Sequence, residues 1–345
     1  MTPVTIIIAL LAFGLLIFVH ELGHFLAAKL GGIQVNEFAL GMGPKLISFV
    51  RGETRYSLRL FPIGGFCAME GADEESDNPR AFNKVRLYKR VLAIAAGSAM
   101  NLLLGFLLLV ILSASSNLIP TNQIGRFHEG ATSSQWLMEG DAITRINGSR
   151  VRTPNDILYQ FSRARYGTLN MEVIRDGERI QLEGVTFQMR EVDGVSFLIW
   201  DFIFVGVPRT PGNVIANAAN WTVTVIRMVW GSLMDLVTGR YGFNQISGPI
   251  GVTSVIGDAV ASGANAWEGF VNLLYIVSII TVNLGVFNLL PFPALDGGRL
   301  IFLGIEAVRR KPAPLKFEAA VNAAGLILLI GLIIVVTVND VFRLF

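Results

Sequence analysis

Residues 4–29 read VTIIIALLAFGLLIFVHELGHFLAAK, an apolar segment whose first titratable side chain is His20. A helix needs about 20 mainly apolar residues to cross a bilayer, so this segment predicts a membrane span. A cleaved signal peptide is the alternative, because the segment is N-terminal. Residues 1–3 carry no basic side chain and the apolar run is too long for a signal peptide, so the span is favoured.

Inside this span lies His20-Glu21-Leu22-Gly23-His24, an HExxH motif. Residues four apart lie on one face of a helix, so both imidazoles can reach one zinc ion. Glu21 then lies beside the metal, where its carboxylate can take a proton from water. If Val4 lies near the outer face, His20 is about 24 Å further along the helix axis, which places the metal site inside the bilayer but toward the cytoplasmic side. Two unrelated buried histidines are the alternative, but ionisable side chains within a span are costly and usually functional.

The composition of the whole chain is that of a membrane protein. Of its 345 residues, 52% are hydrophobic and 16% charged, and the mean hydropathy is +0.55. Soluble proteins carry about 25% charged residues. The net charge of +2 offers no electrostatic footprint for nucleic acid, so we expect no nucleic-acid partner. Three further segments are long and apolar enough to cross a bilayer, residues 91–113, 270–290 and 319–338.

Lysines and arginines cluster in two loops, one between the first two spans and one between the last two. Loops rich in these residues remain on the cytoplasmic side. This distribution predicts that both chain termini and the long middle segment are extracytoplasmic.

The middle segment, residues 117–208, has the pattern of an inserted α+β domain. Residues 143–148 alternate and end in an Asn-Gly turn, and residues 169–180 form a strand, an Asp-Gly turn and a second strand. Residues 155–164 have helical spacing after a Thr-Pro start.

Residues 213–238 are apolar but contain Arg227 and Asp235, which would be costly in lipid. We therefore expect amphipathic helices on or near the membrane here, with a fifth span as the alternative. The predicted organisation has four parts. These are the first two spans with a cytoplasmic β-loop (1–116), the inserted domain (117–208), the membrane-associated helices (209–268) and the last two spans (269–345).

Two histidines leave zinc short of the third protein ligand of a catalytic site. Asp296 is the best candidate, because prolines break the third span just before it and two glycines follow it. Irregular backbone at membrane depth is tolerated where it lines a cavity. The alternative is that Asp296 caps the next helix. Asn288 is a candidate donor to the scissile carbonyl or its oxyanion, or alternatively forms an interhelical hydrogen bond.

The HExxH motif in the first span, the broken span ending in Leu295-Asp296-Gly297-Gly298 and the extracytoplasmic insert resemble the site-2 protease family of intramembrane zinc metalloproteases, most closely its bacterial regulator of sigma-E protease type. Three further motifs share this resemblance: residues 61–66 (FPIGGF), 95–101 (AAGSAMN) and 248–251 (GPIG).

The resemblance implies a polytopic α-helical protein of about four spans with a PDZ-like insert and a membrane-associated β-hairpin. It implies Zn²⁺ held by His20, His24 and Asp296, with Glu21 as general base. It also implies a place in the bacterial inner membrane, among its lipids. The best-known relative has two tandem PDZ domains, whereas the length here fits one.

The implied activity is cleavage of single-span membrane proteins, such as anti-sigma factors or remnant signal peptides, after an upstream site-1-type protease has trimmed them. A helical substrate must unwind before attack. We expect the edge of an alternating strand, residues 56–61, to pair with the extended substrate, although this strand could equally serve only for packing.

Two other classes of function fit the sequence less well than a protease. A membrane scaffold that only binds peptide termini has no need for a base such as Glu21 beside two histidines. A zinc transporter would place more histidines or carboxylates in several spans than this chain does.

Overall fold

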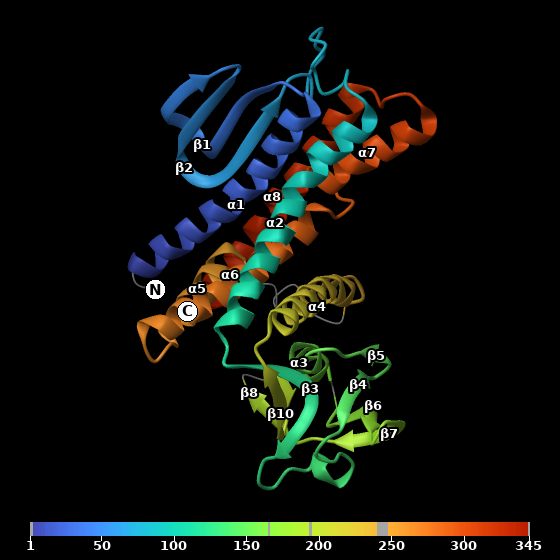
Figure 1. The fold of residues 1–345 in the computed structure, drawn as a ribbon. Helices are drawn as coiled ribbons and strands as arrows, with labels where there is room; N and C mark the ends of the chain where they lie inside the picture. Colours follow the sequence, from blue (N-terminus) through green and yellow to red (C-terminus); the bar gives the residue numbers. More distant parts are fainter. Residues whose placement is uncertain (1–2, 165, 193–194, 240–247, 344–345) are drawn as a thin grey trace. The chain divides into compact units, whose positions relative to one another are not determined.

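The computed structural model describes residues 3–343 except residues 165, 193–194 and 240–247. It divides into two compact units (Figure 1). One unit combines residues 1–108 with residues 229–345, and the other comprises residues 109–228.

Four helices in the described chain are long and apolar enough to cross a membrane, which confirms the predicted polytopic helical class. Their outward faces leave many large apolar side chains exposed, such as Ile327 at 70% and Leu328 at 65%. In water such surfaces would be a liability, but in lipid they are expected. The four helices are α1 (Pro3–Gly31), α2 (Leu87–Ser115), α6 (Ala266–Asn288) and α8 (Leu315–Arg343).

Close helix contacts in the first unit depend on residues without bulk. A side chain on Gly23 of α1 would lie 2.3 Å from the carbonyl oxygen of Ala96 on α2. A Cβ on Gly105 of α2 would likewise lie only 2.4 Å from Cγ2 of Val282 on α6. Such positions let helix backbones approach closely in membranes. This unit also contains two shorter helices, α5 (Pro249–Ala261) and α7 (Asp296–Arg309).

Strands β1 (Val35–Arg51) and β2 (Thr54–Met69) form a long, folded-over hairpin rather than a simple one. Phe38 pairs with both Tyr56 and Cys67, and Tyr56 pairs with both Phe38 and Phe49. The segment around Tyr56 therefore lies in the interior of the sheet, and the expectation that it forms a free edge is wrong. The two edges are residues 45–51 and residues 65–69, and the chain reverses before the second at Gly64, whose φ is +83°.

The second unit contains a six-stranded sheet of order β10-β3-β4-β6-β7, with β5 paired to β4. Asn147-Gly148 and Asp176-Gly177 form its predicted hairpin turns with positive φ angles. Thr153 and Asp156 cap the predicted helix reciprocally. The elements are β3 (Leu118–Phe127), β4 (Ala142–Ile146), β5 (Ser149–Arg150), α3 (Pro154–Ser162), β6 (Thr168–Arg175), β7 (Glu178–Thr186) and β10 (Phe202–Pro208), with β8 (Met189–Val192) paired to β9 (Val195–Leu198).

The expected membrane-associated region contains one long helix, α4 (Pro211–Val237), which is not among the four candidate spans. Its Thr224 hydroxyl donates to buried Asp156 of α3 at 3.0 Å, and Arg227 reaches the same carboxylate at 3.2 Å. These bonds fasten α4 to the inserted domain. Residues 240–247 of the region lie outside the described residues.

Candidate metal centre

His20 and His24 lie one helical turn apart on α1 and present their Nε2 atoms to each other at 3.2 Å. Both are largely buried, with exposed fractions of 9% and 6%. The turn spacing of an α-helix places residues four apart on one face, so the arrangement follows directly from the HExxH spacing.

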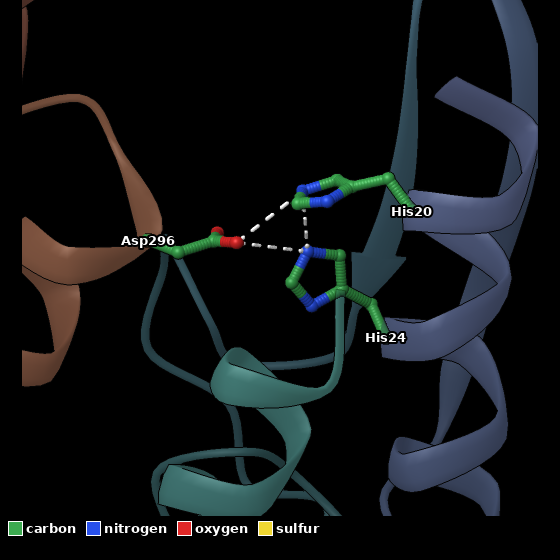
Figure 2. A group of neighbouring side chains, drawn as sticks. All are labelled: His20, His24 and Asp296. Carbon is green, nitrogen blue, oxygen red and sulfur yellow. Dashed lines mark hydrogen bonds and ion pairs between the residues drawn. The ribbon is translucent and has the colours of Figure 1, made fainter. Parts of the chain in front are cut away.

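Asp296 completes the cluster from the other end of the chain. It is the first residue of α7, and its Oδ2 atom lies 3.3 Å from the Nε2 atoms of both histidines (Figure 2). The N-cap residue of α7 is Leu295, and Asp296 is the first residue of the helix. The alternative that Asp296 caps this helix is therefore wrong. Residues 289–295, which contain both prolines, form the irregular connection that turns Asp296 toward α1.

The three candidate ligand atoms have the spacing of a tetrahedral zinc site. With metal–ligand distances near 2.1 Å, tetrahedral geometry separates ligand atoms by about 3.4 Å, and the three observed separations are 3.2, 3.3 and 3.3 Å. The Oδ2 atom of Asp296 is also buried without a hydrogen-bond partner. A buried carboxylate oxygen in that position is costly unless a cation binds it, so the donor set fits a zinc ion.

Both histidines contact helix α2 through their Nδ1 atoms. The Nδ1 atom of His24 lies 2.8 Å from the carbonyl oxygen of Ala93, and the Nδ1 atom of His20 lies 3.3 Å from the Asn101 side chain. Gly97 provides the space, because a Cβ there would lie 2.3 Å from Nε2 of His24. Our sequence interpretation assigned these three residues no role. The only signal was the motif at residues 95–101, which contains Gly97 and Asn101 and is part of the family resemblance.

Glu21 lies beside the three candidate ligands in a cavity of about 430 Å³. The backbone amide of Cys67 donates a hydrogen bond to it, and Gly65 leaves room for its side chain, since a Cβ on Gly65 would lie 3.1 Å from Cγ of Glu21. Asn288 ends α6 and lines the same cavity, with its Nδ2 atom 3.5 Å from Nε2 of His20. All five site residues predicted from the sequence therefore line one cavity.

Cys67 also lines this cavity and is a free cysteine. Burial raises the pKa of its thiol to about 12. The thiol therefore stays neutral near pH 7, whereas a metal is bound by the thiolate. In the part of the chain that the structure describes, only His20, His24 and Asp296 come together as a candidate metal cluster.

The sequence matches the family model of peptidase family M50 over residues 8–332, a range that includes every residue of this cluster. A Clostridium perfringens protein is 36% identical over 337 residues, which cover 97% of this chain and 98% of that protein. The regulator of sigma-W protease RasP of Bacillus subtilis is 30% identical over 425 residues, and the zinc metalloprotease RasP of Bacillus licheniformis is 31% identical over 427 residues. Both of these alignments cover 99% of each chain.

Proposed function

Because the chain belongs to peptidase family M50 and is a multi-pass, site-2-type zinc metalloprotease, we propose that His20, His24 and Asp296 hold its zinc and that Glu21 is its general base. The observation that supports this most is the spacing of the three ligand atoms, which is that of a tetrahedral zinc site. A zinc ion there supplies Lewis-acid polarisation of the scissile carbonyl and activation of water.

Side chains of the protein transfer the proton and stabilise the developing negative charge. Glu21 takes the proton from the attacking water and returns it to the leaving amine, a role that its place beside the ligands in the cavity supports. Asn288 donates its amide N–H to the carbonyl oxygen as negative charge develops there.

The substrate reaches the zinc as an extended strand, paired with the sheet edge at residues 65–69. This edge lines the cavity that contains Glu21. Strand addition satisfies the backbone groups that a substrate helix loses when it unwinds within the membrane.

The substrates are single-span membrane proteins of the anti-sigma-factor type, or remnant signal peptides. The support is that one relative carries the name regulator of sigma-W protease. The inserted domain is a PDZ-like domain that excludes bulky extracytoplasmic parts, so an upstream site-1-type protease acts first. Its strands, its capped helix and its single-domain size support this assignment.

The protein lies in the bacterial inner membrane with both termini and residues 117–208 on the extracytoplasmic side. The support is the clustering of Lys and Arg in the other loops. Alkaline phosphatase fused at the C-terminus or within residues 117–208 should be active, and fused after residue 78 it should be inactive. The opposite pattern would reverse the orientation.

The test of the mechanism is Glu21→Gln, which keeps the shape of the side chain but cannot accept the proton. We expect full zinc content in purified protein and a fall of about 10²–10⁴-fold in cleavage of a model transmembrane segment. His24→Ala provides the contrast, since it should lose both zinc and cleavage. Full activity of Glu21→Gln would remove Glu21 as the base, and full zinc content of His24→Ala would remove the ligand assignment.

A further inference from the structure

Asn101 is completely buried on α2, next to the metal cluster. Its amide nitrogen, as placed in the structure, lies 3.3 Å from Nδ1 of His20. Its amide oxygen, Oδ1, is buried without any hydrogen-bond partner. A buried amide of this kind is costly unless its groups are satisfied, so the orphaned oxygen calls for an explanation.

The chemistry of metal binding supplies one. Both histidines direct Nε2 toward Asp296, so zinc would bind through Nε2, which must then carry a lone pair. In a neutral imidazole the proton then lies on Nδ1, and each Nδ1–H needs an acceptor. For His24 the acceptor is the carbonyl oxygen of Ala93, at 2.8 Å.

For His20 the group in place is the Asn101 amide, and an amide nitrogen cannot accept a hydrogen bond. Rotation of that amide by 180° exchanges its nitrogen and oxygen, which have nearly the same shape. The rotation puts Oδ1 where it accepts from His20 Nδ1–H and moves the amide N–H groups to the position that Oδ1 now occupies.

We propose that Asn101 is a positioning residue for the zinc site. Its side-chain oxygen accepts from Nδ1–H of His20, which fixes the tautomer and ring orientation that leave Nε2 free to bind metal. Such outer partners of metal-binding histidines commonly contribute 10–100-fold to metal affinity. The inference rests on the proposed zinc ligands.

The alternative is that Asn101 only joins helices. Its backbone oxygen does accept a 3.3 Å hydrogen bond from the Thr281 hydroxyl of α6. This bond uses the backbone, however, so it persists when the side chain is changed. The two roles can therefore be separated by substitution.

The experiment measures zinc affinity of the full chain in detergent by competition with a chelator of known affinity. Asn101→Leu removes the acceptor at similar volume, and Asn101→Asp keeps an acceptor oxygen. Ser98→Ala is the matched control, because Ser98 is also fully buried on α2 and its hydroxyl has no partner. We expect zinc binding to weaken about 10–100-fold in Asn101→Leu and to stay close to wild type in Asn101→Asp and Ser98→Ala.

Wild-type affinity in Asn101→Leu, or an equal loss in Asn101→Leu and Asn101→Asp, would overturn the proposal. A second measurement does not depend on the folding of any variant. It is ¹⁵N-histidine NMR of the wild-type protein, which has only three histidines. Zinc-loaded protein should show His20 protonated at Nδ1 and bound through Nε2, and binding through Nδ1 would also overturn the proposal. If wild-type protein and His24→Ala bind zinc equally, the failure lies instead with the proposed ligands.

Discussion

Gly97 shows how a single missing side chain shapes the candidate metal centre. The two imidazoles of α1 occupy the space where its Cβ would be, 2.3 Å from Nε2 of His24 and 2.8 Å from Cε1 of His20. A real Cβ cannot come that close, so Gly97→Ala must displace the rings or separate the helices. Overpacking of this kind costs about 1–3 kcal/mol, and here it falls on the two proposed histidine ligands.

We therefore expect Gly97→Ala to reduce zinc affinity by about tenfold or more, since each 1.4 kcal/mol corresponds to a factor of ten. Chelator competition on the purified protein checks this. Gly14→Ala is the control, because a Cβ at Gly14, on α1, would meet nothing within 4 Å. If Gly97→Ala bound zinc as tightly as Gly14→Ala, the site would be more adaptable than its packing indicates.

At the residue scale, the sequence was informative where chemistry leaves a local pattern. The HExxH spacing predicted that His20 and His24 share a face, and the broken span indicated Asp296, which lies 3.3 Å from both. Asn101 and Gly97 act instead through contacts between α1 and α2, far apart in the chain. An uncharged apolar span does not indicate which of its faces meets another helix, so their roles could not be derived from the pattern.

At the element scale, the sheet edge at residues 65–69 provides a testable docking strand. The amide of Glu70 donates inward to the carbonyl oxygen of Gln34 at 2.9 Å. Successive amides of a strand point to opposite sides, so the amide of Met69 points away from that neighbour, toward the free edge. The amide of Cys67, two residues earlier, is on this same side, where it donates to Glu21.

Met69→Pro removes one outward donor without removing a bond within the sheet, because proline lacks the N–H. We expect kcat/KM for a model transmembrane segment to fall about tenfold, as for the loss of one hydrogen bond of 1–1.5 kcal/mol. Zinc content should be unchanged. Met69→Ala is the matched control, since it keeps the amide, and equal losses in both variants would mean that the side chain of Met69, not the strand edge, matters.

The sequence predicted elements best where their partners are local. The predicted hairpin turns at Asn147-Gly148 and Asp176-Gly177 are confirmed. Such turns fix the pairing of the strands on either side, so a local pattern is enough to predict them. The strand at residues 56–61 was predicted correctly, but the prediction that it forms an edge of the sheet was wrong. Alternation indicates a strand and says nothing of how many neighbours it has, and Tyr56 has one on each side.

At the scale of the whole molecule, the inserted domain can be removed without stretching the chain. Leu118 at the start of β3 pairs with Pro208 at the end of β10, so the two ends of the domain lie next to each other. A short Gly-Ser linker can therefore replace residues 118–208. The remaining chain keeps all four candidate spans and all three proposed zinc ligands.

If the domain excludes bulky substrates, its removal should change which substrates are cut more than how fast they are cut. We expect the full chain to cleave trimmed single-span substrates and to leave untrimmed ones intact, and the deletion variant to cleave both at similar rates. Glu21→Gln in the deletion background must abolish both cleavages, which excludes contaminating proteases. A deletion variant that keeps its zinc and cuts trimmed substrates, but leaves untrimmed ones intact, would contradict this. The order of cleavage would then be imposed by the rest of the chain and not by the inserted domain.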